Sequence, residues 1–505
     1  MKNILEYIEG SAAAYPDKIA FADTENSITY NELLRSAKSI GTKLSSIGTK
    51  NSPIAVYFDK SVKTLCAMFG AVYSGNFYII IDSEMPVDRI NKIFSALSPV
   101  AIITDDAHLD NARQLEADGK IFLYNEAANT QADENVLAKI RDRQIDTDPL
   151  YALYTSGSTG MPKGAVLSHR NVISYTEWFT KAFDISSETV FGNQTPFYFS
   201  MSVSDVYSTI KSGATLCIIP KACFSFPINL IKFLNENKVN TIYWVPSALS
   251  IVANLKLFDY IKPEHLKKVL FAGEVMPTKQ LNYWIHNLDE NTFFANLYGP
   301  TETTDICTYY VVDRQFRDDD PLPIGRHCDN CDVMIVTDKN ELAKAGEEGE
   351  LYVRGSFVAY GYYGNDEKTK AAFVQNPLNP YYPEIVYKTG DLVKENEQGE
   401  IMYITRKDFQ IKRMGYRVEL GEIETAAGSI ANIEECVCVF DKASDKIILV
   451  YQGKKLTAEE ILKCLKAKIP SYMMPDRVEK IALMPHNQNG KIDRKAVTAM
   501  MCDNK

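Results

Sequence analysis

The regular alternation of strand-like and helix-like segments in the first half of the chain most limits the folds it can adopt. Short apolar runs at Ile54–Phe58, Phe77–Ile81 and Val100–Thr104 predict strands, and Val62–Val72 predicts a buried helix. Thr29–Glu32 has the form of a capping box, followed by apolar residues at helical spacing. Strands and helices in this order predict parallel sheets covered by helices.

The same rhythm returns after residue 200. Strands are predicted at three segments and helices at the two between them, in the order Thr215–Ile219, Ile228–Asn235, Asn240–Val245, Leu249–Leu257 and Val269–Ala272. From Gly325 onward the pattern changes to short alternating strands punctuated by glycine, such as Asp332–Thr337 and Glu350–Arg354. We therefore expect a second set of α/β layers and then a β-rich subdomain.

A charged, compact turn lies between strand-like segments in the stretch from Gly399 to Gly421. The residues after it, about a hundred, are enough for a small α+β domain. The predicted fold class is thus α/β, with a large N-terminal domain of helix-covered parallel sheets plus a β-rich subdomain and a small α+β C-terminal domain. We place the domains at residues 1–405 and 406–505.

Composition excludes several classes of protein. The chain has 505 residues, of which 46% are hydrophobic and 24% charged, as in a globular protein. Its net charge of -10 argues against nucleic-acid binding, which uses a basic face. No apolar run approaches the roughly 18 residues of a membrane span and no signal core follows Met1, so we expect a cytoplasmic protein without membrane insertion.

The ten cysteines do not point to a metal site. Cys328 and Cys331 form one close pair and Cys436 and Cys438 another, but neither has a second pair at zinc-site spacing. We expect reduced thiols that serve structural roles.

The segment from Tyr154 to Gly164 combines hydroxyls, glycines and one lysine without apolar periodicity. Glycines allow backbone N–H groups to turn toward an anion, hydroxyls add donors, and Lys163 adds a positive charge. The spacing differs from a Walker A loop, because Pro162 and Gly164 flank the lysine. A flexible linker is the alternative, but strand-like residues on both sides, including Ala165–His169, favour a polyphosphate site for ATP.

A second cluster, Asn296–Glu302, also has the chemistry of a nucleotide site. Tyr298 could stack on a purine, Thr301 could bond a phosphate oxygen, and Glu302 could hold a magnesium ion. An ordinary turn at Gly299 and Pro300 is the alternative for this cluster taken alone.

These motifs together resemble the adenylate-forming superfamily, which includes acyl-CoA ligases, luciferases and the adenylation domains of nonribosomal peptide synthetases. The resemblance covers essentially the whole chain and is greatest with stand-alone amino-acid adenylating enzymes such as the D-alanine carrier-protein ligases. It implies a two-step reaction in which a carboxylate attacks the α-phosphate of ATP, pyrophosphate leaves, and the acyl adenylate is passed to a thiol.

The resemblance assigns roles to the nucleotide-binding residues. It implies that ATP, with Mg²⁺ on Glu302, contacts one residue set: Thr155, Ser156, Gly157, Ser158, Thr159, Gly160, Lys163, Ala272, Gly273, Glu274, Asn296, Tyr298, Gly299, Thr301, Asp391, Arg406 and Lys491. Thr155, Glu302 and Lys491 are the implied catalytic residues. Asp391 would accept hydrogen bonds from the ribose hydroxyls, and a mobile C-terminal domain would rotate about the hinge Asp408 so that one site serves both steps.

The resemblance also implies the residues that hold the acid, namely Ser200, Met201, Ser204, Leu270, Ala272, Leu297, Asp305 and Ile306. Ser200 stands where the family carries an aspartate that pairs with the substrate α-ammonium. A serine supplies a weaker neutral hydrogen bond. Asp305 could pair instead with an amine displaced from the usual position, although a structural role for this aspartate remains open. Asp205 is not diagnostic.

We therefore expect an AMP-forming acid–thiol ligase for a small carboxylic acid, with a D-alanine-like amino acid favoured. The acceptor is expected to be the phosphopantetheine thiol of a separate carrier protein acting in trans. The alternatives are an enzyme for an aryl or other non-α-amino acid, an acyl-CoA ligase, and a non-catalytic adenylate-binding module, which would not need Lys491.

Overall fold

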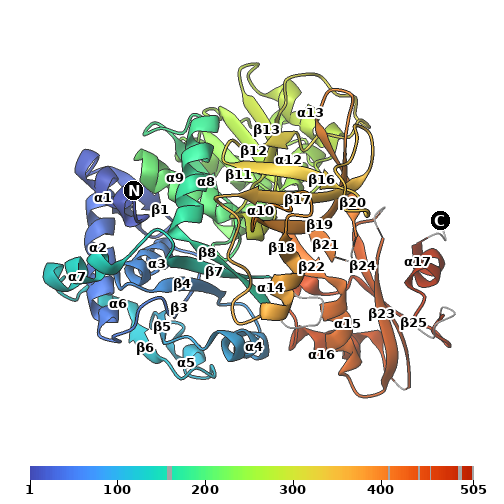
Figure 1. The fold of residues 1–505 in the computed structure, drawn as a ribbon, viewed down its shortest axis with the longest axis horizontal. Coiled ribbons are helices and arrows are strands. Elements are labelled where there is room, and N and C mark those ends of the chain that lie inside the picture. The colour runs from blue at the N-terminus through green and yellow to red at the C-terminus, as the bar shows by residue number, and fades with distance from the viewer. Residues whose placement is uncertain (156–161, 408–409, 442–443, 455, 487–491, 503–505) are drawn as a thin grey trace. The chain divides into compact units, whose positions relative to one another are not determined.

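The computed structural model describes residues 1–155, 162–407, 410–441, 444–454, 456–486 and 492–502 (Figure 1). The chain divides into two compact units. Unit 1 comprises Met1–Ser83, Leu97–Leu153 and Gly164–Lys407, and unit 2 comprises Glu84–Ala96, Tyr154–Lys163 and Asp408–Lys505. The predicted domain boundary between residues 405 and 406 stays a prediction.

A six-stranded sheet forms from the first half of the chain, in the order β6(Lys120–Leu123), β5(Ala101–Thr104), β3(Pro53–Phe58), β4(Phe77–Asp82), β7(Pro149–Thr155) and β8(Lys163–Ser168). The strands from β6 to β7 run parallel to their neighbours. Every residue of β3 and of β5 is buried, which explains why both read as continuous apolar runs rather than as alternating patterns.

A nine-stranded sheet contains the second α/β set. Its order is β15(Arg326–His327), β14(Thr308–Val311), β13(Phe293–Tyr298), β12(Lys268–Ala272), β11(Thr241–Trp244), β9(Val190–Asn193), β10(Thr215–Ile218), β1(Ile19–Ala22) and β2(Ser27–Thr29). The strands from β13 to β1 are parallel, and the edge strands β2, β14 and β15 are antiparallel. The parallel strands therefore end on one edge, where βα loops can gather functional groups.

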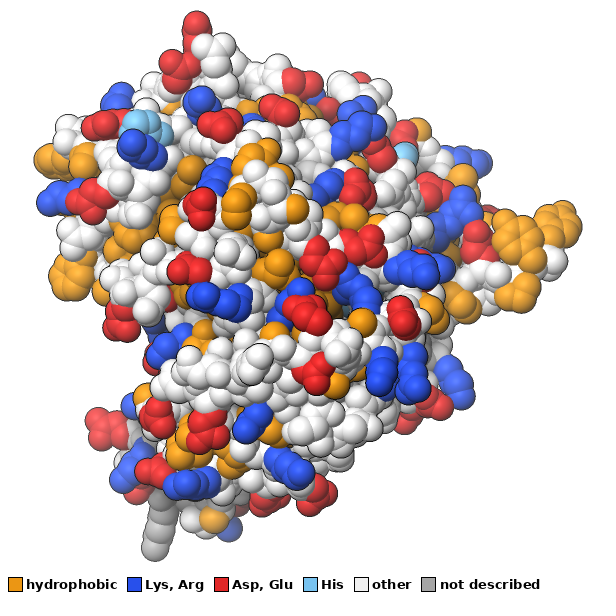
Figure 2. Space-filling model, turned by 90° about the vertical axis from the view of Figure 1, so that its left-hand side faces the viewer, with side chains coloured by type: hydrophobic (Ala, Val, Ile, Leu, Met, Phe, Trp, Pro, Cys, Tyr) orange, Lys and Arg blue, Asp and Glu red, His pale blue; other side chains and the backbone are white. Residues whose placement is uncertain are grey.

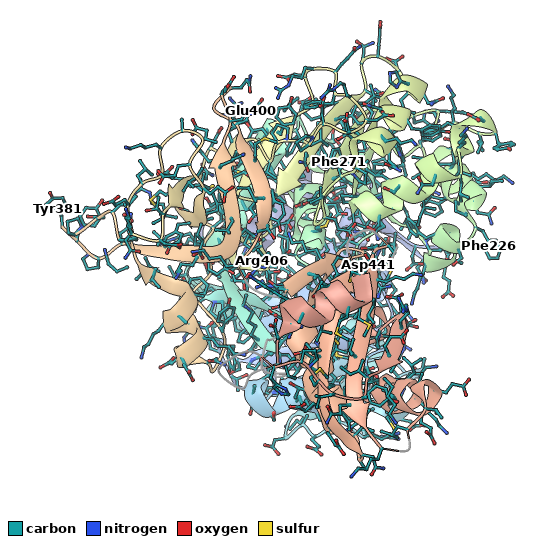
Figure 3. All side chains as sticks on the ribbon, turned by 90° about the vertical axis from the view of Figure 1, so that its right-hand side faces the viewer. Phe226, Phe271, Tyr381, Glu400, Arg406 and Asp441 are labelled. Carbon is teal, nitrogen blue, oxygen red and sulfur yellow. The ribbon has the colours of Figure 1, made fainter. Side chains whose placement is uncertain are left out.

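A five-stranded antiparallel sheet completes unit 1. It is built from β16(Cys331–Val336), β17(Gly349–Gly355), β19(Ile385–Glu395) and β18(Phe373–Gln375), with β20(Ile401–Arg406) paired to β19. Figure 3 shows Arg406 at the end of β20 and Glu400 just before that strand begins. The loop before β19 projects outward at Tyr381, which is 91% exposed.

The two helices predicted before residue 200, α2(Tyr30–Ser45) and α3(Val62–Tyr73), start where the sequence predicts. In α2, the Thr29 side chain accepts from the Glu32 backbone and the Glu32 side chain accepts from Thr29, which is the predicted capping box. The remaining helices up to residue 400 are α1(Leu5–Ala14), α4(Val87–Leu97), α5(Leu109–Ala112), α6(Tyr124–Ala128), α7(Glu134–Arg143), α8(His169–Ala182), α9(Met201–Ser212), α10(Lys221–Ser225), α11(Pro227–Glu236), α12(Pro246–Asn254), η1(Leu257–Asp259), α13(Thr278–Asn287), η2(Thr301–Thr303) and α14(Asp366–Ala372). His169 was predicted as the end of a strand, but Ser168 caps α8 and His169 begins it.

Unit 2 has its own apolar core. It contains the hairpin β21(Gln410–Arg413) and β22(Tyr416–Glu419), and the three-stranded sheet β23(Ile433–Asp441), β24(Lys446–Gly453) and β25(Arg477–Lys480). Its helices after residue 407 are α15(Leu420–Gly428), α16(Ala458–Lys466), η3(Ser471–Met473) and α17(Arg494–Cys502). Residues such as Ile423, Leu449 and Ile461 pack together and are fully buried.

The surface and the cysteines agree with a globular protein. On the face in Figure 2, acidic and basic side chains are interspersed. No helix among the described residues is long and apolar enough to cross a membrane. All ten cysteines are free thiols, as predicted. The described parts of the chain hold no cluster of three metal-ligating side chains.

Candidate functional site

In the loop that follows β13, the backbone at Gly299 lies very close to the backbone of Asp305 and Ile306. A Cβ atom on Gly299 would lie 2.2 Å from the carbonyl oxygen of Asp305 and 2.6 Å from the Cα of Ile306. Only glycine permits this approach, because such short contacts with backbone cannot be relieved by a rotamer change. The tight return brings Thr301, Glu302 and Asp305 together at the end of the strand.

A strained turn centred on Thr304 sets the position of Asp305. Thr304 has φ 68° and ψ -53°, and the Asp305 backbone N–H donates to the Thr303 carbonyl at 2.8 Å, which is a γ-turn with a positive φ at its centre. A threonine adopts this conformation only when its surroundings hold it, and the buried Thr304 hydroxyl donates to the Phe357 carbonyl at 2.8 Å. Strain of this kind gathers at functional sites.

The Asp391 cluster consists of Asp391, Arg406 and Tyr298. The Arg406 guanidinium donates to one carboxylate oxygen of Asp391 at 3.0 Å, and the Tyr298 hydroxyl donates to the other. Burial, and then the negative charge of Asp391, raise the pKa of the Tyr298 phenol well above its usual range, so this hydroxyl stays a neutral donor. A carboxylate oxygen can accept more than one hydrogen bond, so the cluster fits the predicted contact of Asp391 with ribose hydroxyls.

Glu302 is fully buried and firmly placed. Its carboxylate accepts a hydrogen bond from the Tyr362 hydroxyl at 2.6 Å, and its backbone carbonyl accepts one from Ala359 at 2.8 Å. The neighbouring Tyr363 N–H donates to the Gly164 carbonyl at 2.8 Å. One segment thus ties Glu302 to the residue that ends the predicted phosphate loop. A carboxylate at this place fits the donor set that Mg²⁺ prefers.

The end of β12 lies beside the residues predicted to hold the acid. Gly273 has φ +95°, and a Cβ atom on it would lie 3.5 Å from the Met201 sulfur. The Glu274 carboxylate accepts from the Ser247 backbone N–H at 2.9 Å. Ala272 is buried, and Asn296, in the next strand, donates to the Pro323 carbonyl at 2.8 Å.

The Asp305 cluster consists of Asp305, Ser200, Ser204, Tyr175 and Tyr243. One carboxylate oxygen of Asp305 accepts from Ser204 at 2.7 Å, from Tyr243 at 2.9 Å and from Tyr175 at 3.2 Å. Ser200 contributes a further hydrogen bond. Burial raises the pKa of the Asp305 carboxyl to about 6, whereas these hydroxyls act in the opposite direction.

The apolar residues that the resemblance assigns to the acid site lie in the interior of unit 1. Met201, Leu270, Leu297 and Ile306 are all buried. The structure brings Ser200 and Ser204 to Asp305, and the acid-binding role of all these residues stays a prediction. Tyr175 and Tyr243 were not predicted from the sequence as members of the Asp305 cluster.

Asp205 belongs to a different polar group. Its carboxylate accepts from the Asn193 amide at 2.7 Å, and the buried Lys60 ammonium donates to the carbonyls of Asn193 and Gln194 at 3.1 and 3.0 Å. Burial raises the pKa of Asp205 and lowers that of Lys60. Asp205 thus contacts Asn193, whereas Ser204, one residue earlier on α9, contacts Asp305.

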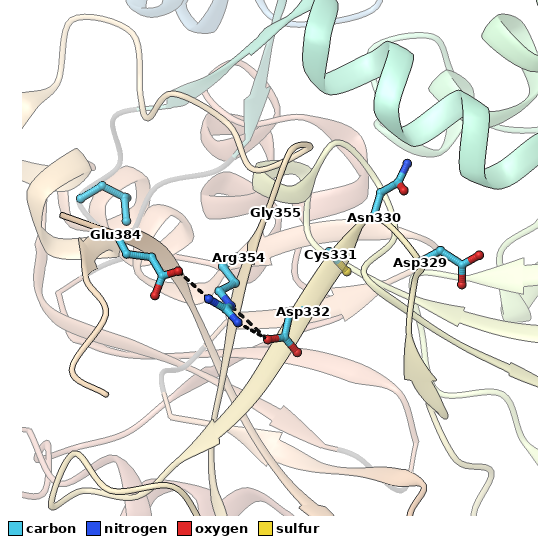
Figure 4. Close-up of a pocket in the computed structure, with 8 residues that line it drawn as sticks. Asp329, Asn330, Cys331, Asp332, Arg354, Gly355 and Glu384 are labelled. Atoms are coloured by element: carbon cyan, nitrogen blue, oxygen red, sulfur yellow. Dashed lines mark hydrogen bonds and ion pairs between the residues drawn. The ribbon is translucent and has the colours of Figure 1, made fainter. Parts of the chain in front are cut away.

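An open pocket elsewhere in unit 1 is lined in part by three charged residues that pair with one another. Arg354 of β17 donates to Asp332 of β16 at 2.8 Å and to Glu384 at 2.5 Å (Figure 4). The guanidinium therefore ties β16 to the segment that enters β19, and we assign it a structural role.

Several predicted residues lie outside the described part of the chain. These are Asp408, Lys491 and, in the phosphate loop, Ser156, Gly157, Ser158, Thr159 and Gly160. Thr155 ends β7 and Lys163 begins β8. The roles given to these residues, and to those that the structure does describe, stay predictions.

Residues 8–363 match the family model described as "AMP-binding enzyme". The chain belongs to this family, which confirms the predicted membership of the adenylate-forming superfamily. Among curated relatives, the chain is 32% identical to D-alanine--D-alanyl carrier protein ligase of Bacillus cereus, over 97% of this chain and 98% of that protein.

Multidomain synthases and solved structures are also similar. The chain is 30% identical to tyrocidine synthase 3 of Brevibacillus parabrevis over 98% of its own length, but it spans only 8% of that relative. The Vibrio cholerae adenylation domain AlmE, solved with glycyl-adenosine-5'-phosphate, aligns with a TM-score of 0.83 and 21% identity over 99% of this chain and 97% of that one. The structural likeness confirms the predicted α/β fold class.

Proposed function

We propose that this chain is an ATP-dependent, AMP-forming ligase that activates a small amino acid and transfers it to the phosphopantetheine thiol of a separate carrier protein. The observation that carries the proposal is the single loop from Tyr298 to Ile306. Its first residue donates to Asp391, its middle holds Glu302, and Asp305 near its end lies in a hydroxyl cluster. One loop thus positions side chains suited to bind a nucleotide and a side chain suited to bind a small amino acid.

The chemistry follows from these positions. The substrate carboxylate attacks the α-phosphorus of ATP, the bond to pyrophosphate breaks, and an acyl adenylate forms. A thiol then attacks the acyl carbon, its proton leaves to solvent, and AMP departs. Asp391 and Arg406 orient the ribose, and Thr301 donates to the phosphates. Mg²⁺, when bound at Glu302, neutralises phosphate charge.

The names of the relatives support an amino acid as the substrate and a carrier protein as the acceptor. The ligase relatives are named for D-alanine and a D-alanyl carrier protein, and AlmE was solved with a glycyl adenylate. Transfer to free coenzyme A is the competing activity. We expect coenzyme A to be a much poorer acceptor than a holo carrier protein.

We further propose that residues 406–505 rotate about Asp408 between the two steps. The division of the chain into compact units between Lys407 and Asp408 supports this position for the hinge. Lys491 would then stabilise the charge that develops during adenylation and leave before thiol transfer.

Lys491→Ala tests the proposal. Without its ammonium group the transition state loses its main charge partner, and we expect at least about a 100-fold loss of ATP–pyrophosphate exchange. Binding of ATP should change less than threefold, measured by calorimetry. Lys495→Ala, in the same C-terminal stretch, is the matched control and should retain exchange. Normal exchange in Lys491→Ala would contradict the proposal.

A further inference from the structure

The Asp305 carboxylate is buried in unit 1 without a positive partner among the described residues. It is 1% exposed, and its hydrogen-bond partners Ser204, Tyr243 and Tyr175 are all neutral hydroxyls. Aspartate is almost never fully buried unless it is paired, because removing the charge from water costs several kcal/mol. Hydroxyl donors reduce this cost but supply no opposite charge.

We propose that Asp305 is the receptor for the substrate's ammonium group, and that the substrate is an amino acid whose amine is carried beyond its α-carbon. This inference rests on the proposed function, which puts an acid at this end of the loop. The missing cation would then come with each substrate molecule. An amine-free aryl acid, by contrast, would leave the carboxylate buried and unpaired.

The position of the amine follows from the order of the hydroxyl groups. The Thr301 hydroxyl, assigned to the phosphate side, donates to the Ser200 hydroxyl at 3.5 Å. Ser200 in turn bonds Asp305. An ammonium held by Asp305 therefore lies one hydroxyl group farther from the reacting carboxylate than an ammonium held at Ser200. A β- or γ-amine reaches that distance, whereas an α-amine stays near Ser200.

The cluster is also held rigidly enough to discriminate. The Tyr175 hydroxyl lies 2.7 Å from the Ser204 hydroxyl and 3.2 Å from Asp305, so the two hydroxyls and the carboxylate are in mutual contact and each hydroxyl proton has two acceptors within reach. The strained turn at Thr304 fixes the Asp305 backbone. A charge-assisted hydrogen bond to an ammonium is roughly twice as strong as a neutral one, so the site selects amines over neutral groups.

The test is ATP–pyrophosphate exchange with the full chain and matched acids. We expect kcat/KM for β-alanine or 3-aminobutanoic acid to exceed that for D-alanine, L-alanine and propanoic acid by at least about tenfold. Asp305→Asn should lower kcat/KM for β-alanine by at least about 30-fold, the loss expected when one member of a buried charge pair is removed. Its effect on propanoic acid should be under threefold.

Controls separate the inference from folding defects and from the proposed function. Asp289→Asn, at an exposed loop, should leave all substrates unchanged, and ATP binding to Asp305→Asn reports its fold. Ser200→Asp should increase the use of α-alanine. Exchange that is best with an α-amino acid, or equal for β-alanine and propanoic acid, would overturn the inference while the proposed function stands. No exchange with any acid would overturn both.

Discussion

A buried carboxylate lies at each end of the loop from Tyr298 to Ile306, and the charges of the two are balanced differently. Asp391 is paired with Arg406, a cation that the chain itself supplies, whereas Asp305 has only hydroxyl donors among the described residues. Ribose hydroxyls are neutral, so a site for them must balance its own charge. A site for an ammonium ion can leave its carboxylate unbalanced until the ligand arrives. The contrast between the two carboxylates therefore indicates that the ligand is neutral at Asp391 and positively charged at Asp305.

The largest expected effect comes from breaking the Asp391 pair. Arg406→Met leaves a buried carboxylate without its cation, and we expect a loss of about 3–5 kcal/mol in the free energy of unfolding, measured by urea denaturation at pH 7. A loss below about 1 kcal/mol would show that the pair does not stabilise the fold.

Asp305→Asn should change the free energy of unfolding in the other direction. The folded-state pKa of Asp305 is raised by burial to about 6, so the wild-type chain loses stability as pH rises from about 4 through 6. The neutral amide escapes this loss. We expect the variant to gain up to about 3 kcal/mol relative to wild type at pH 7 and nothing at pH 4. A variant that is destabilised equally at both pH values would contradict the contrast between the two carboxylates.

Smaller effects are expected from removing one tyrosine hydroxyl from each cluster, and they should fall on different substrates. Tyr298→Phe and Tyr243→Phe each remove one hydrogen bond to a carboxylate, worth about 1.5–3 kcal/mol. We expect Tyr298→Phe to raise KM for ATP at least about tenfold with little effect on the acid, and Tyr243→Phe to do the reverse. Steady-state exchange kinetics with each substrate varied in turn provide the measurement. Equal effects on both substrates would remove the distinction.

The sequence predicts much of this arrangement because its signals are local. The capping box at Thr29 and the apolar run of β3 determine their elements within a few residues. For Leu270 and Leu297 the family resemblance predicts apolar walls of the acid site, and the structure shows that both are buried. From the sequence, Gly299 is predicted only to be part of a turn. The structure shows that its close approach to the Asp305 backbone is what requires glycine.

The hydroxyl shell of Asp305 could not be predicted in the same way. Tyr175 and Tyr243 are 130 and 62 residues away from Asp305 in the sequence. Tyrosines in a helix and in a buried strand read as core residues, and only the packing of α8 and β11 reveals that their hydroxyls converge. The γ-turn at Thr304 has no sequence signal either, since threonine rarely adopts a positive φ.

The pairing of Asp305 with the substrate ammonium is tested most directly by the pH dependence of kcat/KM for β-alanine in ATP–pyrophosphate exchange. This quantity reports the ionisation of the free enzyme, and only the ionised Asp305 carboxylate can pair with the ammonium. We expect kcat/KM to rise through a pKa of about 6 in the wild-type chain and Asp305→Asn to lose this rise. An identical pH profile in both proteins would contradict this pairing.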